Sequence, residues 1–272
     1  MRTARSFLLS THPLPSVAVT LFSVMFAFGL GLSPVHIVLV GVAVLMQQFS
    51  VGLSNDWLDS ARDRAVERTD KPVATQLIGR QVVRNGSFVC ALLAVVTSLF
   101  LGVLPAAWML LMLVVGWSYN LGLKANWSSV LPYAVGFGCL PVFVTLSQQP
   151  PGWPAWWIIT AAALLGVAAH FANALPDLFD DRATGVRALP HLIGQAASAI
   201  VIAVTASVAS LIIFTQSATL NPVVGWLGFT LTIALAVIAS VLTLRPKPPR
   251  IIFVVLILAA MINVIMLVLG LG

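Results

Sequence analysis

The sequence predicts an all-α polytopic membrane protein, with nine transmembrane helices around a central cavity open to the cytoplasmic side and to lipid. Two observations lead to this prediction. Of the 272 residues, 60% are hydrophobic and only 8% are charged. The apolar residues also gather in runs that are long enough to cross a bilayer, which takes about 20 residues of helix. A soluble fold of this size cannot bury so many apolar side chains.

Pro, Gly or charged residues bound each apolar run, and these breakers define the helices in chain order. The predicted segments are 14–32, 35–54, 83–103, 105–121, 129–146, 155–175, 196–215, 222–243 and 250–270. The first run follows a short basic start and has no small-residue cleavage pattern, so it is interpreted as a retained helix. We expect residues 1–272 to form a single domain.

The basic residues divide the loops into two sets. All 14 Lys and Arg fall in the N-terminal tail and in alternate loops: Arg2, Arg5, Arg62, Arg64, Arg68, Lys71, Arg80, Arg84, Lys124, Arg182, Arg187, Arg245, Lys247 and Arg250. The positive-inside rule places these segments in the cytoplasm and the C-terminus outside. The expected location is a bacterial cell membrane. The net charge of +6 then reflects topology and predicts no nucleic-acid partner.

The eight acids occupy only two of the cytoplasmic loops. Asn55–Asp63 (NDWLDSARD) and Asn173–Asp181 (NALPDLFDD) repeat one frame of Asn, three residues, Asp, three residues and Asp. Helical positions four apart lie on one face, about 6 Å apart along the axis, so each motif would align an amide and two carboxylates. Pro176 removes a backbone donor and is expected to kink or restart the second helix before Asp177.

Stacked carboxylates near a bilayer indicate a bound cation, because like charges four residues apart repel and charge at membrane depth is costly. Oxygen ligands without nearby His or Cys favour Mg²⁺, which commonly bridges carboxylates and a substrate phosphate. The basic residues of the same loops can neutralise such a phosphate. Lys124 can reach the cytoplasmic mouth of the predicted cavity by snorkelling.

Other polar residues have plainer interpretations. One Asp-rich loop alone is typical of a solvated turn, but two copies of the frame favour a site. His12, His36 and His170 are interpreted as interfacial or core imidazoles. Gln47, Gln48 and Ser54 are predicted to line a cavity.

Four stretches resemble the UbiA superfamily of intramembrane prenyltransferases. NDWLDSARD resembles the first Asp-rich signature of that family, and ERTDKP resembles the basic loop that follows it. DLFDDRATGVRALPHLIG is similar to the second signature, and YNLGLK resembles the Tyr and Lys element between the two. The resemblance covers essentially the whole chain and implies a nine-helix fold.

The resemblance also implies a site, with Mg²⁺ as the cofactor and an isoprenyl diphosphate as the donor. The implied metal ligands are Asp56, Asp59, Asp63, Asp177 and Asp181. The implied diphosphate contacts are Asn55, Arg68, Lys71, Lys124, Asn173 and Arg182. Catalysis is expected from Asp59, Asp63, Asp177 and Asp181, with Tyr119 near the allylic end of the donor. The expected partners are this donor, a lipophilic or aromatic acceptor and membrane lipid.

Three functions are consistent with these motifs. The first is prenyl transfer, the second is terpene cyclisation on the same scaffold, and a distant third is cation-coupled transport. Aromatic-acid members of the family carry an Arg shortly before the first-helix Pro, whereas here FLLSTHPLP has no Arg at that spacing. This departure argues against a 4-hydroxybenzoate-type acceptor. The acceptors that remain compatible with the sequence are a quinone precursor, another phenol, a lipid glycerol and a sugar phosphate.

Overall fold

The computed structural model of the chain describes residues 2–178 and 185–271, and it is all-helical in these ranges. A short helix, α1 (Arg2–Ser10), precedes nine long ones. These are α2 (Pro13–Gly29), α3 (Pro34–Ala65), α4 (Arg80–Leu99), α5 (Val103–Leu121), α6 (Leu131–Leu146), α7 (Trp156–Ala174), α9 (Leu189–Gln216), α10 (Pro222–Thr243) and α11 (Ile251–Leu269). Short 3₁₀ turns, η1 (Leu123–Ala125), η2 (Trp127–Val130) and η3 (Leu175–Asp177), connect some of them.

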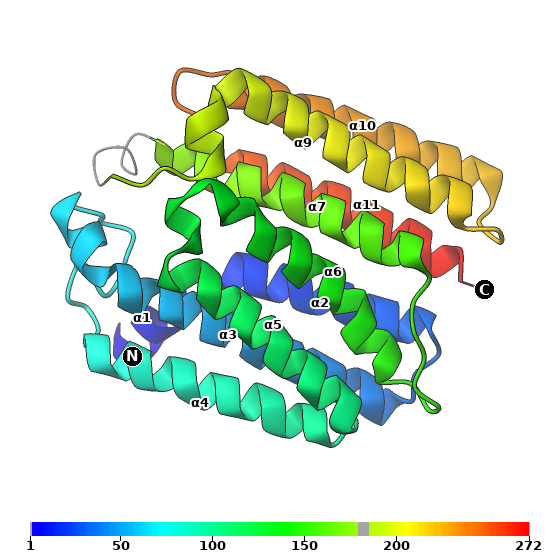
Figure 1. The fold of residues 1–272 in the computed structure, drawn as a ribbon, viewed down its shortest axis with the longest axis horizontal. Coiled ribbons are helices and arrows are strands. Elements are labelled where there is room, and N and C mark those ends of the chain that lie inside the picture. Colours follow the sequence, from blue (N-terminus) through cyan, green and yellow to red (C-terminus); the bar gives the residue numbers. More distant parts are fainter. Residues whose placement is uncertain (1, 179–184, 272) are drawn as a thin grey trace.

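The long helices lie roughly side by side (Figure 1), and their contacts close them into a ring. Each packs against the next in the sequence, and α11 packs against α2, which closes the ring. Additional contacts join α3 to α5, α2 to α6, and α11 to α7. Short connections favour this arrangement, because consecutive antiparallel helices become neighbours in space.

The predicted membrane class is confirmed. Eight helices in the described residues are long and apolar enough to cross a bilayer, and α1 with α2 forms a ninth candidate that bends by 59°. The count of nine therefore holds when this bent pair is one span. His12 lies at the bend, with a left-handed φ of 53°.

Some predicted boundaries were wrong at the charged ends. The second predicted segment stops at residue 54, whereas α3 continues to Ala65 and carries the whole first motif. Hydropathy ends a segment where charge begins, but a helix can continue into the water phase because its backbone hydrogen bonds are internal. The seventh predicted segment starts at residue 196, whereas the corresponding helix, α9, starts at Leu189. This helix is interrupted at Gly194, where φ is 80°.

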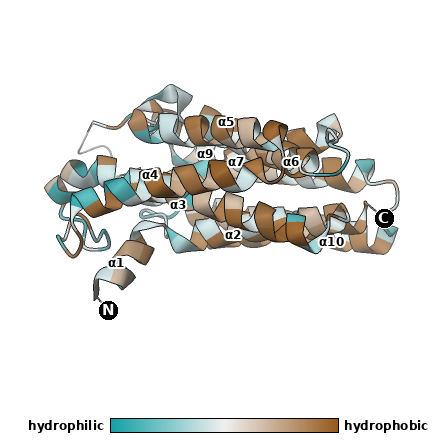
Figure 2. Ribbon diagram, turned by 90° about the horizontal axis from the view of Figure 1, so that it is seen from below, coloured by the Kyte–Doolittle hydropathy of each residue, from teal (hydrophilic) through white to brown (hydrophobic). Residues whose placement is uncertain are grey.

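One end of the bundle carries the charge. Hydrophilic residues gather where α1 and the α3–α4 connection lie (Figure 2). The connections at the opposite end, 30–33, 100–102, 147–155 and 217–221, contain no charged residue. The N- and C-termini lie at opposite ends (Figure 1), as an odd number of spans requires. The absolute orientation in the membrane stays a prediction.

A close approach between α3 and the start of α2 shapes the charged end. A Cβ atom at Gly52 would lie 2.5 Å from the carbonyl oxygen of Thr11, so only glycine fits there. This contact brings His12 beside the turn of α3 that follows Gly52. The first Asp-rich motif begins on that turn.

Candidate active site

The first motif forms the predicted stripe on α3. Asn55 Nδ2 donates to Asp59 Oδ2 at 3.1 Å, as expected for side chains one turn apart. Asp59 and Asp63 are 7% and 3% exposed. Burying two carboxylates on one face is costly unless cations neutralise them.

Asp59 is neutralised by two cations. Lys124 Nζ lies 2.5 Å from Asp59 Oδ1, and Arg62 Nη2 donates to Oδ2 at 3.0 Å. Lys124 belongs to η1, which follows α5, so the contact joins two helices. Burial lowers the pKa of the Lys124 ammonium, and the charge of Asp59 opposes this effect. Lys124 thus contacts an acid of the first motif, and its role at a diphosphate site stays a prediction.

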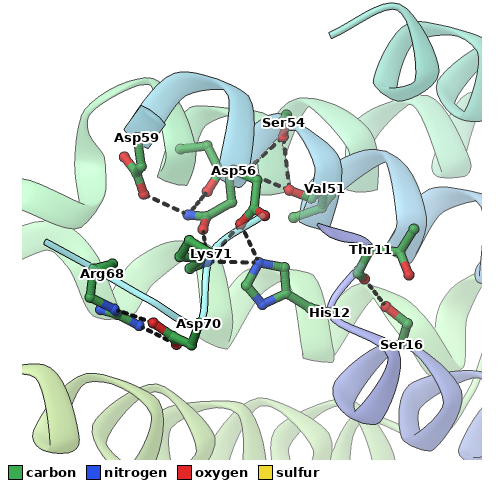
Figure 3. Close-up of polar contacts among 12 residues, drawn as sticks. Thr11, His12, Ser16, Val51, Ser54, Asp56, Asp59, Arg68, Asp70 and Lys71 are labelled. Atoms are coloured by element: carbon green, nitrogen blue, oxygen red, sulfur yellow. Dashed lines mark hydrogen bonds and ion pairs between the residues drawn. The ribbon is translucent and has the colours of Figure 1, made fainter. Parts of the chain in front are cut away.

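Asp56 lies at the centre of a second cluster (Figure 3). It is 1% exposed. Lys71 Nζ donates to its Oδ1 at 2.6 Å, and His12 Nε2 lies 3.0 Å from the same oxygen. Lys71 also lies within 3.4 Å of Asn55 Oδ1. The loop after α3 thus turns back over the motif, as expected for a basic covering loop.

The interpretation of His12 as an interfacial imidazole did not include its contacts with charged residues of the site. The imidazole contacts both Asp56 and Lys71, with Lys71 Nζ 3.1 Å from Nε2. His12 and Asp56 are 44 residues apart in the chain, so no local pattern predicts the pair. The only feature of the sequence that could have indicated this role is the position of His12 directly before Pro13.

The second motif departs from the predicted stripe. Helix α7 ends at Ala174, and Leu175–Asp177 forms a 3₁₀ turn. Pro176 explains the break, because its ring lacks the donor that an α-helix needs. Asn173 and Asp177 are therefore not on one continuous helical face. Asp180, Asp181 and Arg182 lie outside the described residues.

Arg68 and Arg250 connect the second motif to the loop that follows the first motif. Arg68 pairs with Asp70 at 2.8 Å and with Asp177 at 3.2 Å. Arg250, at the start of α11, pairs with Asp70 at 2.7 Å and with Asp177 at 3.5 Å. The hydrogen bond from Arg68 holds the pKa of Asp70 below its ordinary range and raises that of Arg68. The sequence analysis predicted Arg68 as a diphosphate contact, but it used Arg250 only to predict the orientation of the chain in the membrane.

Asn120 is a further residue that the sequence interpretation did not assign. It is 5% exposed on α5. Its Nδ2 donates to Ser54 Oγ at 2.8 Å and to the Val51 carbonyl at 2.9 Å, and its Oδ1 accepts from Asn55 at 3.1 Å. Asn120 therefore fixes the orientation of the Asn55 amide. It lies within the YNLGLK element, next to Tyr119.

A cavity of about 230 Å³ opens beside this charged end. Residues of α2, α3, α5, α6, α7 and α11 line it, Asn55, Tyr119 and Asn173 among them. The ring of Tyr119 lies 5.3 Å from that of Tyr133. Gln47 and Gln48 line the cavity as predicted, whereas Ser54 is not part of the lining.

The donor set suits Mg²⁺ with few protein ligands. Within residues 2–178 and 185–271, no three His, Cys, Asp or Glu side chains converge as a complete metal site. Asp59 and Asp63 nevertheless offer two buried carboxylates on one face of α3. Mg²⁺ is usually held by one or two carboxylates, several waters and substrate phosphates. The residues present therefore fit this ion without forming a closed protein cage.

Comparison with known proteins assigns the family. Residues 16–262 match the UbiA prenyltransferase family. The bacteriochlorophyll synthase 33 kDa chain of Cereibacter sphaeroides is 30% identical over 193 residues, which are 66% of this chain and 62% of that protein. The chain therefore spans less than two thirds of the length of this relative.

Two solved structures share the fold. A UbiA homologue from Aeropyrum pernix K1 has a TM-score of 0.75 at 15% identity, covering 90% of this chain and 94% of that one. A UbiA homologue from Archaeoglobus fulgidus, bound to GPP and Mg²⁺, has a TM-score of 0.71 at 15% identity, covering 97% and 98%.

Fold and site together define an integral membrane protein with an apolar cavity, and Asn55 and Asn173 of the two motifs line this cavity. The chain belongs to the UbiA prenyltransferase family. The resemblance carried by the paired motifs is thus confirmed at the level of the family.

Proposed function

We propose that this enzyme transfers an isoprenyl group from an allylic isoprenyl diphosphate to a lipophilic or aromatic acceptor, with Mg²⁺ as cofactor. One observation carries the proposal. An acid of each motif pairs with basic side chains of neighbouring loops, and the Asn of each motif, Asn55 and Asn173, lines an apolar cavity. A diphosphate needs such cations, whereas its isoprenyl tail needs the apolar space behind them.

Asp59, Asp63 and Asp177 would hold Mg²⁺, with Asp181 as the remaining predicted ligand. Asp56 is also a predicted ligand: Lys71 and His12 contact its Oδ1, and its Oδ2 has no hydrogen-bond partner among the described residues. When bound, the metal would stabilise the negative charge that develops on the leaving diphosphate.

Side chains of the protein would bind and orient the diphosphate. Lys124, Lys71, Arg68 and Arg182 would bind the diphosphate oxygens, and Asn55 and Asn173 would orient them. Their charges stabilise the departing diphosphate as the C–O bond breaks. Tyr119, in the cavity wall, would lie near the allylic carbon, and the apolar lining would keep water from the cation.

The proposal also includes the orientation of the protein in the membrane and its domain organisation. The charged end would face the cytoplasm of a bacterial cell, because basic residues accumulate on that side of membranes. The whole chain would act as one catalytic domain, with its cavity open to that side and to lipid. Membership of a family of prenyltransferases favours transfer to a second molecule over cyclisation of the donor or cation transport.

The proposal predicts a strict requirement for three components. Purified protein incubated with geranyl diphosphate, Mg²⁺ and an extract of membrane lipids should yield a prenylated product that mass spectrometry identifies. Chelation of Mg²⁺ with EDTA should abolish the product, and excess Mg²⁺ should restore it. A product formed equally well in EDTA would contradict the metal role, and consumption of the donor without any lipid extract would indicate a cyclase.

A further inference from the structure

The cavity has a polar patch away from the acidic motifs. Gln47 and Gln48 lie on α3, eight and seven residues before Asn55, on the order of 11 Å deeper along the helix axis. Both line the cavity, and Gln47 is only 4% exposed. This depth places two amides inside the apolar part of the bundle.

The two amides keep most of their hydrogen-bonding capacity. Gln48 Nε2 donates to Gln47 Oε1 at 2.7 Å, and this is the only hydrogen bond of the pair within the described residues. One N–H of Gln48, both N–H groups of Gln47 and the Gln48 carbonyl oxygen therefore stay available. Buried amides without partners are costly, so the patch suits a ligand that carries hydrogen-bonding groups.

The isoprenyl tail is a poor match for this patch, because hydrocarbon cannot form hydrogen bonds. A second, mostly apolar cavity of about 70 Å³ adjoins the first along α6, α7 and α11. The two share the wall residues Phe22, Phe137, Leu140, Leu165 and Ala260. This branch suits the tail and leaves the glutamine patch to the other substrate.

The charge of that substrate follows from the lining. Among the described residues, no Asp, Glu, Lys or Arg lines the larger cavity. A carboxylate or phosphate beside the glutamines would be buried without a counter-ion, which is far more costly than burying a neutral hydroxyl. Amides instead pair well with hydroxyl and carbonyl groups.

We propose that Gln47 and Gln48 form the acceptor site, and that the acceptor is an uncharged molecule bound through hydroxyl or carbonyl groups. This inference rests on the proposed function and narrows it. Aromatic carboxylates and sugar phosphates are then excluded as acceptors, whereas neutral phenols and quinols fit.

Fractionated lipids test the charge of the acceptor directly, whatever its chemical identity. Membrane lipids of the source organism are separated on an anion-exchange resin into neutral and acidic fractions. Each fraction is incubated with the full-length enzyme, Mg²⁺ and radiolabelled geranyl diphosphate. Label should enter a product from the neutral fraction. Label only in products of the acidic fraction would overturn this inference alone, whereas no product from the whole extract would overturn the proposed function and this inference with it.

Variants test the glutamine pair itself. Gln48→Met and Gln47→Met keep the side-chain size but remove the amide, and each should raise the amount of neutral fraction needed for half-maximal transfer about tenfold. The half-saturating concentration of geranyl diphosphate should stay within about twofold, because the amides do not contact the donor. Gln81→Met, at an exposed position on α4, is the matched control. Unchanged acceptor dependence in both variants would mean that the amides bind only water, and would refute the site.

Discussion

Asp59→Asn is expected to lower the rate of prenyl transfer by about 100-fold or more. The substitution keeps the shape of the side chain but removes its charge, and with it a proposed ligand of Mg²⁺. It also leaves Lys124 without its partner at 2.5 Å. Loss of one member of a buried pair costs about 3 kcal/mol of unfolding free energy, so stability must be measured beside activity.

A double variant separates the two effects. Asp59→Asn with Lys124→Met removes both charges, so its thermal unfolding in detergent should approach that of the wild type, while its transfer activity should stay lost. Glu67→Gln, an exposed acid of the adjacent loop, is the control and should retain activity. If Asp59→Asn transferred prenyl groups within about twofold of the wild-type rate, the proposed role of this carboxylate would be wrong.

Lys71→Met should destabilise the protein by about 3 kcal/mol and release the loop after α3. Lys71 is the principal counter-charge of Asp56, whose Oδ2 is buried and has no hydrogen-bond partner among the described residues. Without the ammonium, His12 alone would face a buried carboxylate. Unfolding in a denaturing detergent measures the loss, and trypsin cleavage within residues 62–71 measures the release of the loop.

Restoring the charge balance should reverse the effect. Lys71→Met combined with Asp56→Asn should regain most of the stability, because neither buried charge remains. Lys247→Met removes an exposed positive charge from another loop at the same end and should leave unfolding unchanged. A single Lys71→Met variant as stable and as resistant to trypsin as the wild type would show that the cluster around Asp56 carries little energy.

The first motif was predictable because its geometry is local. Asn55 and Asp59 meet on α3 since any helix places residues four apart on one face. The same rule failed after Ala174, where Pro176 ended the α-helix, although the sequence did indicate a break there. Repetition of a frame identifies residues of a site, but it does not ensure that both copies share one backbone conformation.

The missed residues are those whose partners are distant in the chain. His12 pairs with Asp56 across 44 residues, and Arg250 pairs with Asp70 across 180 residues. Neither contact leaves a periodic pattern, because each depends on how separate helices pack. Asn120 lies within the YNLGLK element, yet its role became clear only when its amide met Asn55 and Ser54.

Hydropathy alone determined the membrane class, the order of the helices and the end of the bundle that carries the charges. These properties follow from transfer free energies that are summed along the chain, residue by residue. Only the tertiary structure decided which cation neutralises which acid. An ion pair requires two atoms within a few ångströms, and the Gly52–Thr11 approach that brings His12 to Asp56 arises from the packing of helices rather than from either segment alone.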